Sequence, residues 1–78
     1  MKEQKPYLIV TFHTTAAAMA MEKHCAAAGI SGKLIPIPRA LSADCGIAWR
    51  CAPEARSAVE QLLRQHPLET EGLYELTL

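Results

Sequence analysis

The sequence predicts one α+β domain with the element order βαββαβ, in which two helices cover one face of a four-stranded antiparallel sheet. Three observations predict it. The chain has 78 residues, enough for a single hydrophobic core but not for two. Four short strand-like runs surround two segments with helix caps or helical periodicity. A proline inside one of the runs restricts that strand to an edge of the sheet.

The first strand and the first helix follow each other closely. Tyr7 to Phe12 is a β-branched and aromatic run that is apolar on both faces, which is typical of a central strand. Thr14 or Thr15 offers an N-cap hydroxyl to a helix over 16–28, and Gly29 stands where a left-handed residue often ends a helix. The face expected to pack on the sheet carries Ala17, Ala18, Met21, Cys25 and Ala28.

Two further strands are expected in the middle of the chain. The run Gly32 to Pro38 is strand-like, but Pro36 has no amide hydrogen to give to a second neighbour, so this strand belongs at an edge. The run Gly46 to Cys51 follows it. Its core face carries Ile47, Trp49 and Cys51.

The second helix and the last strand complete the order. Pro53 suits a first helical turn, and the helix must end before Pro67. Its apolar stripe is Ala55, Val59, Leu62, Leu63 and His66, and Glu60 and Arg64 have the spacing of an ion pair. Leu73 to Leu78 alternates as a strand does. The complete order is that of the ferredoxin-like fold, with the first and third strands central.

Composition excludes several functional classes. Eight Lys and Arg balance eight Asp and Glu, so no uniform positive field would attract a nucleic acid or an anionic membrane. No apolar segment approaches the about 20 residues that span a bilayer, and the charged start of the chain is unlike a signal peptide, so we expect a cytoplasmic protein. Three cysteines without a Cys-x-x-Cys pair favour reduced thiols, with no structural zinc and no cofactor.

The segment between the second and third strands carries the strongest candidate for chemistry. It runs over 38–46, which is longer than the about two to five residues that a hairpin needs. The predicted topology brings Cys45 towards His13, Thr14 and Thr15, at the start of the first helix. We therefore expect an exposed, reactive Cys45.

Three positive groups could stabilise the thiolate of Cys45. They are the helix start, Arg39 and a protonated His13. Gly46 would leave room around the sulfur, whereas the carboxylate of Asp44 would raise the pKa of the thiol.

Each of these residues also has a purely structural interpretation. Arg39 could be a solvated charge, Ser42 a turn former, His13 the end of a strand, and Thr14 or Thr15 only a helix cap. Cys25 and Cys51 fall on core faces, so simple packing is the favoured role for both. Trp49 is expected to fill the core or an edge of the sheet. His24 and His66 lie beside helix core stripes without a paired ligand, and we interpret them as structural.

The motif Pro38-Arg39-x-x-Ser42-x-x-Cys45-Gly46, preceded by 35–37, resembles a family of small bacterial selenium/sulfur carrier-like domains. A weaker likeness lies in Thr15, Ala17 and Glu22. The resemblance extends from the first strand through the second helix. It implies that Cys45 carries sulfur or selenium as a persulfide or its selenium counterpart, with Arg39 and Ser42 in support.

The same resemblance implies partners. The atom would come from a donor, commonly a cysteine desulfurase, and pass to an acceptor enzyme, so the domain would be a relay rather than a complete enzyme. Cys51 stands where the family has a plain apolar residue, which leaves a resolving-thiol role open. The cargo, sulfur or selenium, is also open.

Two other classes remain as alternatives. The domain could be a structural or regulatory module that binds a partner through a sheet face or edge, with an unreactive Cys45. It could also be a metal-binding domain, although the loop after the first strand offers His13 and two threonines without a cysteine pair. Whether the domain forms homodimers is open.

Overall fold

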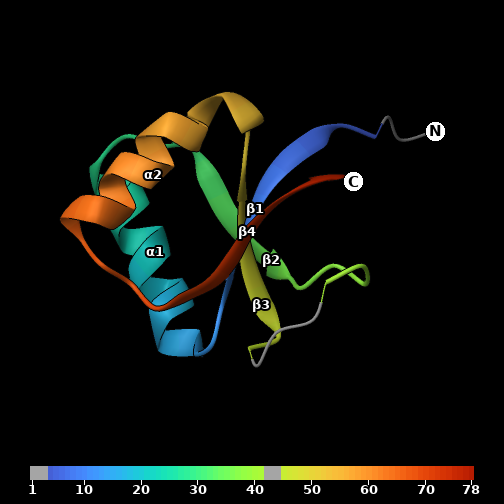
Figure 1. The fold of residues 1–78 in the computed structure, drawn as a ribbon, viewed down its shortest axis with the longest axis horizontal. Helices are drawn as coiled ribbons and strands as arrows, with labels where there is room; N and C mark the ends of the chain where they lie inside the picture. Colours follow the sequence, from blue (N-terminus) through green and yellow to red (C-terminus); the bar gives the residue numbers. More distant parts are fainter. Residues whose placement is uncertain (1–3, 42–44) are drawn as a thin grey trace.

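The computed structural model describes residues 4–41 and 45–78 and contains the predicted order of elements (Figure 1). The elements are β1 (Pro6–Phe12), α1 (Thr15–Ala27), β2 (Gly32–Pro36), β3 (Ile47–Cys51), the 3₁₀ turn η1 (Pro53–Ala55), α2 (Arg56–Gln65) and β4 (Thr70–Thr77). The strands form one sheet in the order β2-β3-β1-β4, and each neighbouring pair is antiparallel. The α+β prediction is therefore confirmed, with β1 and β3 central and β2 and β4 at the edges.

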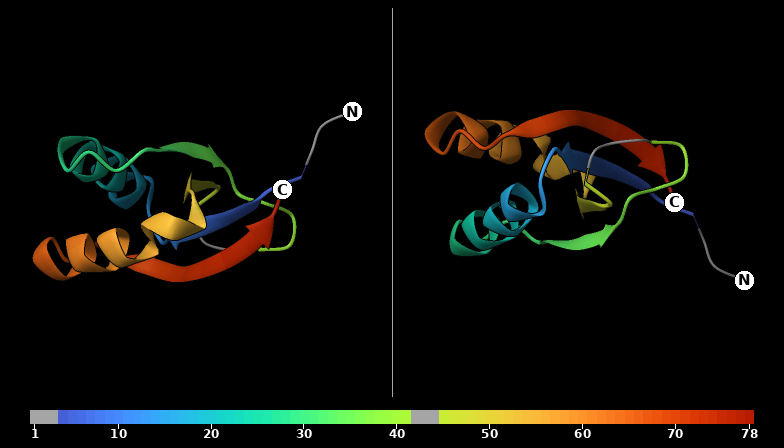
Figure 2. Two further views of the ribbon diagram at one scale, coloured as in Figure 1. Left: turned by 90° about the horizontal axis from the view of Figure 1, so that it is seen from above. Right: turned by 90° about the horizontal axis from the view of Figure 1, so that it is seen from below.

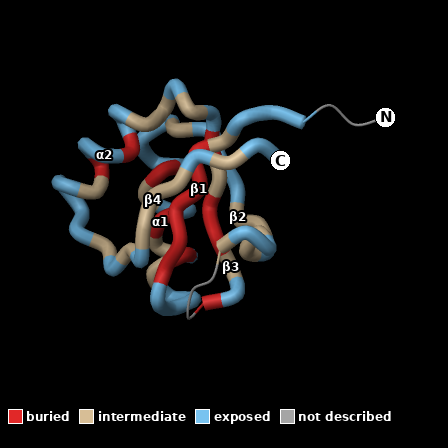
Figure 3. Tube along the Cα trace, turned by 45° about the vertical axis from the view of Figure 1, so that its right-hand side comes forward, coloured by how far each residue is buried: buried red, intermediate tan, exposed pale blue. Residues whose placement is uncertain are grey.

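The strand β1 lies at the centre because it is apolar on both faces. Leu8, Val10 and Phe12 face the helices and have no exposed surface. Ile9 and Thr11 point to the other face and are equally covered. The backbone of β1 pairs with β3 on one side and with β4 on the other, and Figure 3 shows the resulting buried centre of the sheet.

Both helices lie on one side of the sheet (Figures 1 and 2). The core forms between them and the two central strands, and small or flexible side chains on α1 let this helix approach closely. The buried residues of this core are Leu8, Val10, Phe12, Ala18, Met21, Cys25, Trp49, Cys51, Val59 and Leu62.

The face of the sheet opposite to the helices is also covered at its centre. Ile9, Thr11 and Ala48 have no exposed surface there. The guanidinium of Arg50 lies over the ring of Tyr7, 4.4 Å from its centroid, and residues 37–41 lie on this side of the sheet (Figure 1). An interaction module that uses the middle of this face is therefore not favoured.

The helix α1 begins and ends at polar and glycine signals. Of the two threonines, Thr14 is the N-cap, and its hydroxyl accepts a hydrogen bond from the Ala17 amide at 3.1 Å. Gly29 has φ of 76°, the left-handed conformation expected of it. Ala28 is exposed instead of packed, because it is the C-cap and lies beyond the last helical turn.

Pro36 occupies an edge strand, as predicted, and it is the last residue of β2. The predicted end at Pro38 was too late. Pairing continues for one hydrogen bond beyond the strand, because the Ile37 amide donates to the Gly46 carbonyl at 2.9 Å.

The second helical segment differs from its prediction in two details. Pro53 opens the 3₁₀ turn η1, and the α-helix follows it. The expected partner of Glu60 was Arg64, but Arg56 takes that place, with Nε 3.2 Å from a carboxylate oxygen of Glu60. Arg56 also reaches Glu75 on β4 at 2.9 Å, so one guanidinium bridges the helix and the edge strand.

The strand β4 begins earlier than the predicted Leu73 because it contains a β-bulge. Thr11 pairs with Gly72 but Phe12 pairs with Thr70, so Glu71 is an extra residue in the ladder. An extra residue interrupts the alternation of side chains, and alternation was the only sequence signal for this strand. None of the helices in the described ranges is both long and apolar enough to cross a membrane.

Candidate functional site

The side chain of Cys45 lies against the first residue of α1. Its Sγ is 3.6 Å from the hydroxyl oxygen of Thr15, and either atom can be the donor. The register explains the contact: Thr11 pairs with Ala48, so the residues that precede β3 run beside those that follow β1. The predicted proximity of Cys45 and Thr15 is therefore confirmed.

The predicted exposure of Cys45 is wrong. Its relative exposed surface is 4%, and it is classed with the buried residues. The residue follows a polar loop in the sequence, but its side chain turns inward to the start of α1 instead of into solvent.

The sulfur of Cys45 lies at the N-terminal end of α1. The first amide groups of a helix carry a partial positive charge, which stabilises a nearby thiolate. The first turn of α1 contains no acidic residue that would neutralise this charge. Thr14 caps the helix with its own hydroxyl, which leaves the hydroxyl of Thr15 to the sulfur.

Two other predicted site residues, Arg39 and His13, are exposed. Arg39 is exposed in a turn closed by the Leu41 amide donating to the Pro38 carbonyl at 3.0 Å. No hydrogen bond or ion pair joins Arg39 to Cys45 in the described part of the structure. His13 is exposed between β1 and the helix cap. Ser42 and Asp44 lie outside the described residues.

Gly46 leaves open space beside Cys45. A Cβ atom added at Gly46 would meet no other atom within 4 Å. Its φ is not positive, since the only residue described with positive φ is Gly29. The backbone conformation therefore does not demand glycine at position 46.

Cys25 and Cys51 lie in the core, as predicted, with exposed fractions of 1% and 3%. Burial raises the pKa of each thiol to about 11, and for Cys51 the negative charge that Cys25 would carry adds to the effect. Both thiols are therefore protonated at neutral pH, which argues against a resolving role for Cys51.

The sequence did not reveal a polar network at the same end of β1. The hydroxyl of Thr11 donates to Glu71 at 2.6 Å, and the hydroxyl of Tyr74 donates to the same carboxylate oxygen at 2.9 Å. This hydrogen bond raises the pKa of Tyr74. The ring of Tyr74 lies over Gly72, where an added Cβ would come within 2.8 Å of the phenolic oxygen. Only the bulge brings these groups together, and nothing in the sequence marks a bulge.

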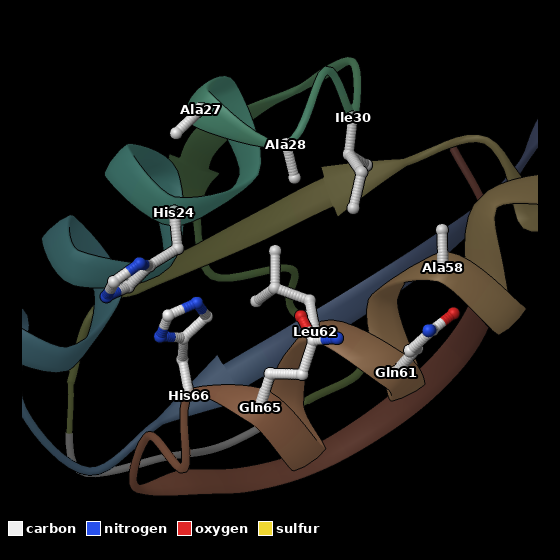
Figure 4. A pocket seen from close by; sticks show the side chains of 9 residues that line it. All are labelled: His24, Ala27, Ala28, Ile30, Ala58, Gln61, Leu62, Gln65 and His66. Carbon is white, nitrogen blue, oxygen red and sulfur yellow. The ribbon is translucent and has the colours of Figure 1, made fainter.

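A second missed feature is a pair of histidines between the helices. The rings of His24 and His66 stack with centroids 4.2 Å apart and an interplanar angle of 17°. They border a cavity of about 380 Å³ between α1 and α2 (Figure 4). The two residues are far apart in the sequence, so the interpretation of each as an isolated structural residue overlooked the contact.

The metal-binding alternative receives no support near Cys45. Within residues 4–41 and 45–78 there is no group of three or more His, Cys, Asp or Glu side chains placed to hold one metal ion.

The fold and the site define a small α+β domain with a thiol held at the start of a helix. The family model described as "Putative Se/S carrier protein-like" matches residues 7–75. The chain belongs to this family, as the loop motif indicated. The comparisons with curated proteins and with solved structures gave no match.

Proposed function

We propose that this domain carries a sulfur or selenium atom on Cys45 and relays it from a donor protein to an acceptor enzyme. Family membership supports the carrier class. The observation that supports Cys45 as the carrier residue is its sulfur 3.6 Å from the Thr15 hydroxyl, at the positive end of α1.

The proposed step is a thiol–persulfide exchange. The thiolate of Cys45 attacks the outer sulfur of a persulfide on the donor, commonly a cysteine desulfurase. A new sulfur–sulfur bond forms on Cys45, the donor's sulfur–sulfur bond breaks, and the donor leaves as a thiolate. Delivery repeats the exchange with a thiolate of the acceptor. Neither transfer needs an external oxidant or reductant.

The burial of Cys45 adds a requirement to this mechanism. With 4% of its surface exposed, the sulfur must turn outward before a donor reaches it. The open space beside Gly46 gives the donor a way to approach. Arg39, exposed earlier on the same connection, would contact the surface of the partner instead of the resting sulfur.

Mass spectrometry tests the proposal directly. The reduced protein is incubated with a cysteine desulfurase and cysteine, and we expect the mass of one added sulfur atom. Cys45→Ser should abolish the addition, whereas Cys51→Ala, a change in the core at the other end of β3, should retain it. An added sulfur that persists in Cys45→Ser would exclude Cys45 as the carrier. A parallel incubation with a selenium donor distinguishes the two cargoes.

A further inference from the structure

We propose that His24 and His66 form a binding site for a first-row divalent transition-metal ion. The site lies between the helices and does not depend on the function proposed for Cys45. Imidazole nitrogens suit Zn²⁺, Ni²⁺ and Cu²⁺, and the two rings come from different parts of the chain, one from α1 and one from the end of α2.

The two rings are near neighbours and could reach one ion after they turn out of their stack. Bonds between Zn²⁺ and histidine nitrogen are about 2.0–2.1 Å long, so two nitrogens on a tetrahedral ion lie about 3.3 Å apart. In the structure the rings are stacked, with centroids 4.2 Å apart and an interplanar angle of 17°, so their in-plane nitrogen lone pairs do not yet point to a common ion. An ion lies in the plane of each ring that binds it, so the stacked rings must turn about their Cβ–Cγ bonds to share one.

The surroundings allow that rotation. His66 is exposed and His24 is half-buried, and both side chains border the cavity of about 380 Å³ (Figure 4). The space beside them is large enough for an ion with its water ligands. Gln65 lines the same cavity between Gln61 and His66, whereas the Gln61 amide lies at the other end of it beside Ala58, so water would supply most of the remaining ligands (Figure 4).

Electrostatics favours a cation at this place. The described residues that line the cavity include no Lys or Arg, so no fixed positive charge within it repels an ion. His66 is the C-cap of α2, and the carbonyl groups at a helix C-terminus carry a partial negative charge. With two protein nitrogens, the site should bind more weakly than a structural zinc site with four protein ligands.

Thermal denaturation of the full chain with Ni²⁺ tests the site. A Cys45→Ser background removes binding at that thiol, and Mg²⁺ serves as the control ion. A ligand of the folded state raises the melting temperature. We expect Ni²⁺ to raise the melting temperature of the background protein, and His24→Asn or His66→Asn to abolish this rise. Each change should weaken Ni²⁺ at least tenfold in calorimetric titration.

The matched control is His13→Asn, which removes the third histidine, before the start of α1, and should retain the rise. Each variant is compared with its own metal-free melting temperature, so that lost stability is not mistaken for lost binding. No rise in the background protein, or a rise that survives His24→Asn or His66→Asn, would overturn the proposal.

Discussion

Cys45 is buried like the other two cysteines, but its neighbours are chemically different. All three are buried. Cys25 and Cys51 lie among apolar core residues, and their thiol pKa values are raised. Cys45 touches a hydroxyl at a helix start. Exposure alone therefore does not distinguish Cys45 from the two core thiols, and its polar neighbour does.

The two core thiols make stability fall in alkaline solution. Burial raises their pKa from 9.0 to about 11, so between these values the unfolded chain loses protons that the folded protein keeps. The unfolded state then binds fewer protons, and the free energy of unfolding decreases as the pH rises. Urea titrations at several pH values measure the free energy of unfolding. In the double variant Cys25→Ala, Cys51→Ala this free energy should fall less steeply with rising pH than in the parent protein. If the free energy of unfolding falls with pH equally steeply in the parent and the double variant, the two thiols do not cause the alkaline loss of stability.

Two glycines should respond differently to alanine. At Gly46 an added Cβ meets nothing, so Gly46→Ala should change the free energy of unfolding by less than about 0.5 kcal/mol. At Gly32 the Cβ would overlap the Trp49 ring and lie 2.6 Å from the Arg50 carbonyl oxygen. Overpacking of this kind costs about 1–3 kcal/mol. Chemical denaturation of Gly46→Ala and Gly32→Ala measures both losses in the free energy of unfolding. A larger loss for Gly46→Ala than for Gly32→Ala would contradict the prediction.

At the scale of elements, α1 depends on its N-cap. The Thr14 hydroxyl accepts the Ala17 amide at 3.1 Å, so Thr14→Ala leaves that amide without its cap. We expect a loss of about 1 kcal/mol. Thr14→Ser keeps the acceptor and should retain most of the stability. Urea denaturation followed by circular dichroism measures both, and a Thr14→Ala protein as stable as the parent would contradict the capping role.

The bulge in β4 depends on the buried hydroxyl of Thr11. Thr11→Val has nearly the same shape but cannot donate to Glu71, which Thr11 reaches at 2.6 Å. A hydrogen bond to a charged group contributes about 1.5–3 kcal/mol, and the exposure of Glu71 favours the lower end. Tyr74→Phe removes the more exposed hydrogen bond to the same carboxylate and should cost less. Equilibrium unfolding that ranks the two variants in reverse would contradict this assignment.

At the scale of the whole molecule, one core implies one unfolding transition. Trp49 is 1% exposed and packs with residues of both helices and β1. Its fluorescence should therefore change at the same urea concentration as the far-ultraviolet circular dichroism, as expected of a small two-state domain. Separate midpoints would show that part of the sheet unfolds independently of the core around Trp49.

Local signals predicted most of the architecture. The Thr14 cap, Gly29 and Pro36 each act through their own backbone or that of close neighbours, so the sequence alone located the first helix and the edge strand. The loop motif that ends in Cys45 and Gly46 likewise identified the family, because a motif is a property of the sequence. The predicted start of β4 at Leu73 was three residues late, because a bulge at Glu71 interrupts the alternation of side chains there.

The sequence by itself determined the order of the elements and the two core cysteines, and it made Cys45 the candidate carrier residue, because these inferences follow from periodicity, backbone chemistry and motif spacing. Only the tertiary structure decided that Cys45 is buried against Thr15, that Thr11 and Tyr74 share Glu71, and that His24 meets His66. Such contacts join residues far apart in the chain. Their distances depend on strand register and helix packing, which no local pattern encodes.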